Sequence, residues 1–416
     1  MTVARTKQKR GPMDGLTRLA MLFYFLAFLM LFFKSWDFVA LALCAAVPAV
    51  ILAGSSFLPR RLGLDRSLML LLHFLCALSV LLLYRFDPER GLRQCLHYAI
   101  GMGTLTVCAL AVRRFERRPV YAALLAALGL LFLAAPLVLG REVNGARNWV
   151  FIGSVSFQPS EAVKLCLLLV LAYLLSTRHR ILAGVYAVLC LLLLMLQKDL
   201  GTAFLYYAVT LAMLYLSTGS MLLVGAGAAG AAAAGVFGYT QFAHVRRRVA
   251  IWIDPWADPS GDGYQIVQGL IAMANGGAWG VGLGLGNASV IPYYHNDFIF
   301  SVILNEMGAV FGLIVLGMYL CIVVRGLMLA RRARSAFDTL LAAGSACLIC
   351  LQTFVIVGGN IKLIPLTGVT LPFISYGGTS MLSSMSVLGM MAGVASRVDD
   401  SLGEDRRIAG MREESR

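Results

Sequence analysis

A carboxylate stands where a polar stretch of the sequence meets an apolar one. Asp297 follows His295 and Asn296, and an apolar run begins directly after it at Phe298. A carboxylate within hydrogen-bonding distance of a substrate hydroxyl can take up its proton. Aspartate is also common as the cap of a following helix. Asp297 is therefore a candidate helix cap, which its position alone favours, and a candidate general base.

Two opposite charges stand three positions apart at the start of another apolar segment. Glu161 and Lys164 would share one face of a helix. Charges at membrane depth are costly and usually pair, so the spacing predicts an ion pair that either fixes the helix or contacts a substrate. Asp199 precedes a further apolar segment and offers a similar choice between a cap and a functional carboxylate.

The segment 362–381 is apolar but contains two prolines and three glycines. Irregular backbone at membrane depth requires protein or a water-filled cavity to satisfy its polar groups. The sequence therefore predicts a cavity lined by Ser375, Tyr376, Gly377 and Gly378.

The elements that must position these residues are membrane helices. The chain is 59% hydrophobic and only 13% charged, whereas a soluble protein is about one-quarter charged. Apolar windows of about 18 residues, each long enough to cross a bilayer, recur along the chain. We predict an all-α polytopic membrane protein with about twelve transmembrane helices. Their expected bounds are residues 16–33, 37–57, 67–84, 95–112, 119–139, 161–177, 181–197, 199–217, 220–241, 298–325, 337–361 and 371–395.

Arginine and lysine gather before the first of these helices, after the second, fourth, sixth and tenth, and in the tail, which predicts that these segments are cytoplasmic. This bias accounts for the net charge of +14 without nucleic acid as a partner. Both termini are then cytoplasmic, with residues 1–15 as a short N-terminal segment and 397–416 as a disordered tail. The polar stretches 140–159 and 243–297 fall on the external side.

Cys347 and Cys350 have CxxC spacing but no second cysteine pair, and the five histidines show no zinc spacing, so no metal ligands are assigned. The glycine-rich run 280–286 follows no expected strand and is not followed by Gly-Lys-Ser/Thr. A nucleotide-binding loop is therefore excluded there.

Six ordered motifs resemble the SEDS family of membrane glycosyltransferases, which includes FtsW, RodA and SpoVE. The motifs are GARNWVFIGSVSFQPSEAVKL, QKDLGTA, the DP-x-x-DP-x-G-x-GYQ-x-x-Q block over 254–268, GGAWGVGLG, HNDFIFSVILNEMG and PLTGVTLPFISYGGTS. The essential aspartate of the family is matched by Asp297. Lys198 replaces a common proline, and Glu306 is the remaining member of a usual glutamate pair.

The resemblance implies a ten-helix core at 59–396 with an external catalytic loop at 243–297, preceded by two additional helices within 16–58. It implies a peptidoglycan glycosyltransferase in the bacterial cytoplasmic membrane, acting in cell elongation, division or sporulation. Glycan linked to undecaprenyl pyrophosphate would be transferred onto lipid II with inversion. Asp297 would be the base, and the adjoining helix N-terminus is expected to keep its pKa low.

The resemblance also implies which groups meet the substrate. Arg147 and Arg246–Arg248 are candidates for the pyrophosphate, although contact with lipid headgroups, worth about 1 kcal/mol per cation, is an alternative. A divalent cation, Mg or Mn, could share this role. A class B penicillin-binding protein, a transpeptidase, is the expected partner. The expected substrate-binding residues are Arg147, Trp149, Glu161, Lys164, Asp199, Arg248, Gln265, Gln268, His295, Ser375, Tyr376 and Gly377.

Two other functions would use similar features. A lipid II flippase or transporter would also need a cavity, a charge pair within the membrane and broken helices, but no inverted repeat is visible in the sequence. A non-catalytic scaffold for a transpeptidase would have no need of Asp297. The external loop that ends in this carboxylate favours a polymerase.

Overall fold

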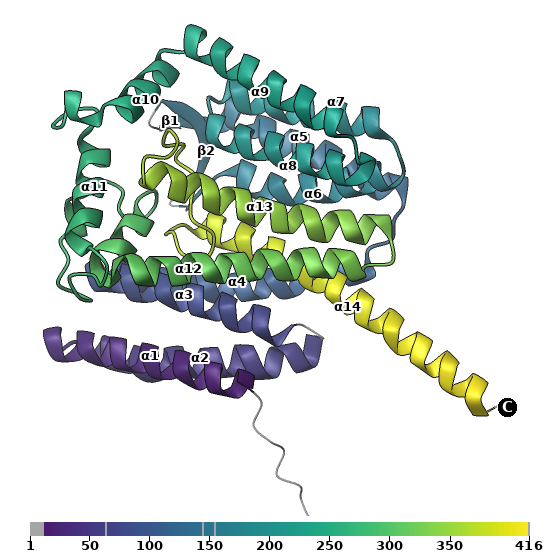
Figure 1. Cartoon of the computed structure of the whole chain (residues 1–416), viewed down its shortest axis with the longest axis horizontal. Coiled ribbons are helices and arrows are strands. Elements are labelled where there is room, and N and C mark those ends of the chain that lie inside the picture. Colours follow the sequence, from purple (N-terminus) through teal and green to yellow (C-terminus); the bar gives the residue numbers. More distant parts are fainter. Residues whose placement is uncertain (1–11, 63–64, 144, 154, 415–416) are drawn as a thin grey trace, which may run out of the picture.

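The computed structural model describes residues 12–62, 65–143, 145–153 and 155–414, and its regular structure is mostly helical (Figure 1). Eleven helices in these ranges are long and apolar enough to cross a membrane, and α7 is a shorter apolar helix of 17 residues. The predicted polytopic helical fold is confirmed. The twelve helices are α1 (Pro12–Ser35), α2 (Phe38–Leu62), α3 (Arg66–Phe86), α4 (Pro88–Arg114), α5 (Pro119–Leu139), α6 (Pro159–Ser176), α7 (Arg180–Leu196), α8 (Leu200–Thr218), α9 (Met221–Gln241), α12 (Ile299–Arg332), α13 (Ala336–Asn360) and α14 (Gly378–Glu414).

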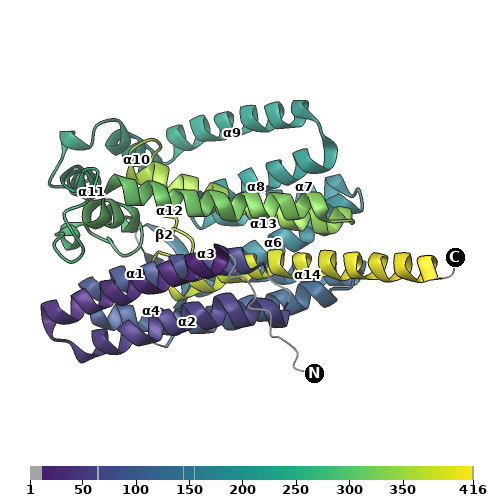
Figure 2. The same cartoon turned by 60° about the horizontal axis from the view of Figure 1, so that its bottom comes forward.

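The connection between α9 and α12 is folded. It contains α10 (Ala243–Ile253), α11 (Tyr264–Gly276) and two short 3-10 helices, η1 (Pro255–Ala257) and η2 (Ala288–Val290). α10 and α11 lie at one end of the helix bundle (Figures 1 and 2). Polar side chains of this connection are thus gathered beyond the ends of the membrane helices.

A small sheet lies at the same end and was not foreseen. β1 (Gly140–Val143), β2 (Ala146–Ile152) and β3 (Val155–Phe157) form an antiparallel sheet in this order. Gly145, at φ +81°, lies in the turn between β1 and β2. β2 contains Trp149, Val150, Phe151 and Ile152, residue types that favour extended backbone. This sheet is an addition to the predicted all-α class.

Two boundaries of α14 differ from the prediction. The helix begins at Gly378 rather than near residue 371, because residues 361–377 adopt irregular backbone. It also continues to Glu414, so the expectation of a disordered tail is wrong. The tail contains no proline and many arginine and glutamate residues, which are good helix formers.

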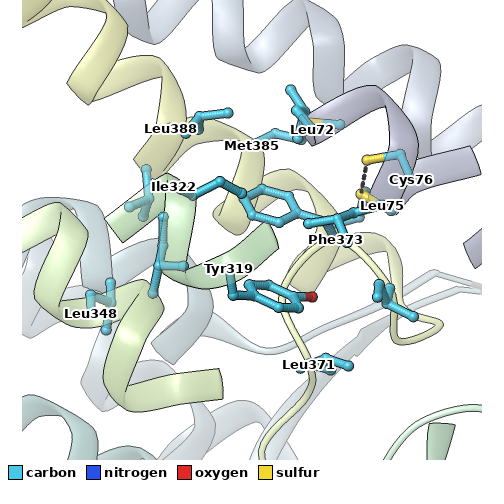
Figure 3. Packing of buried hydrophobic residues seen from close by; sticks show 14 of the residues in the cluster. Leu72, Leu75, Cys76, Tyr319, Ile322, Leu348, Leu371, Phe373, Met385 and Leu388 are labelled. Atoms are coloured by element: carbon cyan, nitrogen blue, oxygen red, sulfur yellow. Dashed lines mark hydrogen bonds between the residues drawn. The ribbon is translucent and has the colours of Figure 1, made fainter. Parts of the chain in front are cut away.

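The irregular segment 361–377 is anchored in the hydrophobic core. Figure 3 shows Phe373 among side chains of α3, α12 and α14, with Tyr319 beside it. The Tyr319 hydroxyl donates to the Pro372 carbonyl oxygen. The segment is therefore fixed at a defined depth although it contains no helix.

The glycine-rich run packs against a break in α12. Gly308 has non-helical backbone at φ +81°, and a Cβ atom there would lie 2.4 Å from the carbonyl oxygen of Ala278. The amide groups of Val281 and Ala309 form backbone hydrogen bonds across this contact, to Asn305 and Gly277 respectively. The glycines thus permit close contact between two backbones, which agrees with the rejection of a nucleotide loop.

Candidate active site

A cavity of about 370 Å³ lies at the end of the bundle where α10 and α11 are found. We call it the loop cavity. Four separate parts of the chain form its wall: the turn between β1 and β2, the junction of α7 with α8, the connection between α9 and α12, and the segment 361–377. Its lining residues are Gly145, Ala146, Lys198, His244, Arg247, Arg248, Ile251, Asp262, Gln265, Ile266, Tyr293, Asp297, Leu366 and Gly368.

Asp297 is half-buried in this wall, and its carboxylate does not cap α12. The cap position is Phe298, with no side-chain hydrogen bond. The Asp297 carbonyl oxygen instead accepts a 2.6 Å hydrogen bond from the Asn360 side chain, which holds the backbone. Burial raises the pKa of Asp297 to about 6, although nearby Arg248 acts in the opposite direction. The expected low pKa is therefore wrong, because desolvation outweighs the favourable charges.

The arginine cluster is divided between different partners. Arg247 forms an ion pair with Asp262. Arg248 donates to the carbonyl oxygens of Leu366 and Thr367 at 3.3 and 3.2 Å. Both line the loop cavity, whereas Arg246 is exposed and does not. Of the predicted cations, Arg248 is the one whose charge acts on Asp297, because it lowers the pKa of that carboxyl group.

Only one of the two predicted glutamines lines the loop cavity. Gln265, in the first turn of α11, donates a 2.9 Å hydrogen bond to the Pro292 carbonyl oxygen. This bond ties α11 to the residues that precede Asp297. Gln268 lies about one turn further along and is half-buried, outside the lining.

Ser375 and Tyr376 fix the backbone before Asp297 through hydrogen bonds, and neither they nor His295 line the loop cavity. The Ser375 hydroxyl donates to the Asn296 carbonyl oxygen at 2.8 Å, and the Tyr376 amide donates to the His295 carbonyl oxygen at 2.8 Å.

Gly377 follows these residues at φ +149°, a conformation that L side chains rarely adopt. Ser375 and Tyr376 thus position the residues before Asp297, and none of the predicted residues Ser375, Tyr376, Gly377 and Gly378 lines the loop cavity.

Arg90 is a neighbour of this segment that sequence reasoning missed. Its guanidinium lies 2.8 Å from Nδ1 of His295. Burial, followed by the charge of Arg90, lowers the pKa of His295 to about 4. His295 is therefore neutral at physiological pH. The sequence shows Arg90 only as a cation at the start of a helix. Such cations are common, so nothing marked this one as a neighbour of His295.

Arg147 and Trp149, the predicted residues of the stretch 140–159, and Asp199 do not line the loop cavity, although their neighbours Ala146 and Lys198 do. Arg147 donates to the Gly140 carbonyl oxygen at 2.9 Å, and Trp149 is a half-buried residue of β2. Asp199 caps α8 through the Thr202 amide at 3.2 Å. It also accepts hydrogen bonds from the side chains of Asn148 and Gln158. The capping interpretation of Asp199 thus agrees with the structure.

Glu161 and Lys164 form the predicted ion pair, at 2.7 Å and with side chains 6% and 1% exposed. Lys164 also approaches the Gln352 side-chain oxygen at 3.3 Å, and Gln352 donates to the Thr370 carbonyl oxygen at 2.9 Å. The pair therefore supports the irregular segment 361–377. It does not line the loop cavity.

Glu306, the other carboxylate of the matching motif, is engaged elsewhere. It pairs with Arg85 at 2.8 Å and accepts a 3.2 Å hydrogen bond from the Gly284 amide. Its side chain is fully buried. In the described residues, no group of three or more histidine, cysteine or acidic side chains is placed to hold a metal ion.

The sequence pattern of the FtsW/RodA/SpoVE family, described as cell cycle proteins, matches residues 65–399. The chain belongs to this family. Its two N-terminal helices, α1 and α2, precede the matched residues. They lie along α3 at the edge of the bundle (Figures 1 and 2).

Named relatives and solved structures of the FtsW/RodA/SpoVE family agree. The peptidoglycan glycosyltransferase RodA of Mycobacterium tuberculosis is 35% identical over 326 residues, which cover 73% of this chain and 70% of that protein. A probable peptidoglycan glycosyltransferase FtsW of Geobacter sulfurreducens is 33% identical, covering 74% and 85%.

A chain of a peptidoglycan synthase complex that coordinates polymerization and crosslinking matches with a TM-score of 0.68 and 30% identity, over 81% of this chain and 99% of that one. RodA of Thermus thermophilus matches with a TM-score of 0.59 and 28% identity, over 81% and 98%.

Proposed function

We propose that the loop cavity is the site where this chain, a peptidoglycan glycosyltransferase, polymerises glycan strands from lipid II. The observation that carries the proposal is the placement of Asp297. Its carboxylate lines a cavity, caps no helix, and has no hydrogen-bond partner among the described residues. A carboxylate left free in a polar cavity is available for a reacting hydroxyl.

The proposed reaction joins two lipid-linked sugars. The 4-hydroxyl oxygen of lipid II attacks the anomeric carbon of the donor glycan, and the bond from that carbon to the donor pyrophosphate breaks. Asp297 takes the hydroxyl proton as the new bond forms. A pKa of about 6 keeps most of the carboxylate ionised at pH 7 and makes it a stronger base than an ordinary aspartate. Arg248 supplies positive charge beside it.

A class B penicillin-binding protein is the proposed partner, and it would cross-link the strands made here. The likeness to a chain of a complex that coordinates polymerization and crosslinking supports this pairing. Both RodA and FtsW are among the relatives, so the strands are proposed to serve elongation, division or sporulation.

One assay separates the polymerase from a flippase and from a scaffold. The purified full chain, together with a class B partner, is given fluorescent lipid II, and the products are separated on a gel. A polymerase yields a ladder of glycan lengths. A flippase moves lipid II without extending it. With a scaffold, any ladder would be made by the partner and would not depend on this chain. No ladder, or a ladder that does not depend on this chain, would contradict the proposal.

The proposal requires the loop cavity to face the outside of the cell, with both chain termini in the cytoplasm. Ser260 lies in the connection between α9 and α12 and is exposed. In a variant without native cysteines, Ser260→Cys is expected to react with a membrane-impermeant thiol reagent in intact cells. A cysteine at Ser335, between α12 and α13, is the cytoplasmic control. Labelling at the control with protection at Ser260 would reverse the assigned orientation.

A further inference from the structure

Lys198 is an unassigned cation in the wall of the loop cavity. Its side chain is exposed, and its ammonium group has no hydrogen-bond or ion-pair partner within the described ranges. The other two cations in the wall are engaged, Arg247 with Asp262 and Arg248 with main-chain carbonyl groups. Lys198 is thus the cavity-lining cation of the described ranges whose charged group makes no contact with the protein.

The backbone of Lys198 is held in an unusual conformation. Its φ is +60°, in the left-handed region that residues other than glycine and asparagine rarely adopt. The Lys198 amide donates to Met195 at 3.0 Å, and the next amide, of Asp199, donates to Leu194 at 2.9 Å. Asp199 in turn caps α8. The base of the lysine side chain is therefore fixed at the end of α7, while its flexible stem reaches into the cavity.

The α7–α8 junction packs tightly against another wall of the cavity. A Cβ atom on Gly201 would lie 2.7 Å from the Thr367 carbonyl oxygen, which also accepts a hydrogen bond from Arg248. Burial, with smaller effects from Arg248 and Lys198, lowers the pKa of His244. Lys198 and Arg248 therefore act on the same small region of the loop cavity.

The charges that line the cavity do not cancel. Three cations and two carboxylates line it, and His244 is neutral at physiological pH. Arg247 is balanced by Asp262, and Arg248 lies near Asp297. One positive charge remains, that of Lys198. A cavity with a free cation and a positive excess is suited to a polyanion.

We propose that Lys198 binds the pyrophosphate of the lipid-linked donor and stabilises it as the leaving group. This inference rests on the proposed function. When the donor bond breaks, its electron pair remains on a pyrophosphate oxygen, and the ammonium group donates hydrogen bonds to the charge that develops there. Asp297 holds the proton from the acceptor hydroxyl, so the two residues serve the two ends of one displacement.

The test compares binding of undecaprenyl pyrophosphate with binding of undecaprenyl monophosphate. It uses the full chain with Asp297→Asn as background, so that little polymer forms. Lys198→Asn removes the charge, and asparagine tolerates the left-handed backbone, so the fold is retained. Lys198→Arg keeps the charge.

Lys362→Asn is the matched control. Lys362 also has φ +60°, but its ammonium group donates to the Ile253 carbonyl oxygen and it does not line the cavity.

We expect Lys198→Asn to weaken pyrophosphate binding about ten- to a hundredfold, the scale of hydrogen bonds to charged groups. Monophosphate binding should weaken much less, Lys198→Arg should stay within about threefold, and Lys362→Asn should bind like the background. An unchanged preference for pyrophosphate in Lys198→Asn would overturn the assignment, as would an equal loss for both lipids, which indicates a role in the turn alone. Failure of the proposed function appears separately, as polymerisation by the background variant.

Discussion

Asp297→Asn is expected to lower the rate of glycan polymerisation by about two orders of magnitude or more, the scale of a lost general base. Asparagine keeps the size of the side chain but cannot take up the acceptor proton. Folding should survive, because the contact that holds this residue runs from Asn360 to its main-chain carbonyl oxygen and is unaffected by the substitution. Lipid II binding and association with the partner should therefore persist.

The matched control for this substitution is Asp262→Asn. Asp262 also lines the loop cavity, but its carboxylate is paired with Arg247 and is exposed. We expect a loss below about tenfold there, since an exposed ion pair contributes about 0–1 kcal/mol. Polymerisation by Asp297→Asn at near the parental rate would show that another group is the base. Glu306 is then the next carboxylate to replace, although its pairing with Arg85 argues for a structural role.

Glu161→Gln or Lys164→Met is expected to cost about 3–5 kcal/mol in the free energy of unfolding, because either change leaves an unpaired charge in a buried site. The two side chains are 6% and 1% exposed, and the pair braces the irregular segment 361–377 through Gln352. Loss of the pair should therefore also impair activity, through the residues that this segment positions.

The double substitution Glu161→Gln with Lys164→Met should cost less than the sum of the single ones, because it removes both charges together. Thermal unfolding of the four proteins in one detergent measures this. An exposed pair provides the control: Glu89 and Arg93 are 74% and 62% exposed, and Glu89→Gln should change stability by less than about 1 kcal/mol. Fully additive single effects at Glu161 and Lys164 would show that the two charges are not coupled.

The membrane helices could be predicted from the sequence because hydrophobic length alone identifies them. All twelve expected spans correspond to helices of the structure. The small sheet at 140–157 could not be foreseen in the same way, since strands this short give little periodicity and depend on packing against the bundle. The helical tail beyond Arg397 could not be predicted from its polarity, because disordered segments and exposed helices are both polar.

The sequence predicted which residues belong to the site better than it predicted what each of them contacts. Asp297, Arg248 and Gln265 do line one cavity, and the pairing of Glu161 with Lys164 followed from helical spacing. Sequence spacing gave no means to tell that Ser375 and Tyr376 would hold the backbone at Asn296 and His295 rather than face the cavity. Whether these side chains face the cavity depends on which side of the irregular segment 361–377 is turned toward it, and sequence spacing does not determine this.

The pKa of Asp297 was predicted in the wrong direction for a related reason. The helix dipole, which acts over the first turn, was visible in the sequence as the start of α12. The burial of the carboxylate in the wall of a cavity formed by four separate parts of the chain was not. Desolvation depends on this tertiary arrangement, and it is the larger effect here.

The dependence of the polymerisation rate on pH tests the role of Asp297 most directly. Its pKa of about 6 means that the carboxylate is ionised above this pH and protonated below it, and only the ionised form can act as the base. Initial rates on fluorescent lipid II, at low substrate and from pH 5 to 8, should be level above pH 7 and fall about tenfold per unit below pH 6. The residual rate of Asp297→Asn should lack this fall. The same fall near pH 6 in Asp297→Asn, or a level rate through pH 5 in the parent, would contradict the assignment of Asp297 as the general base.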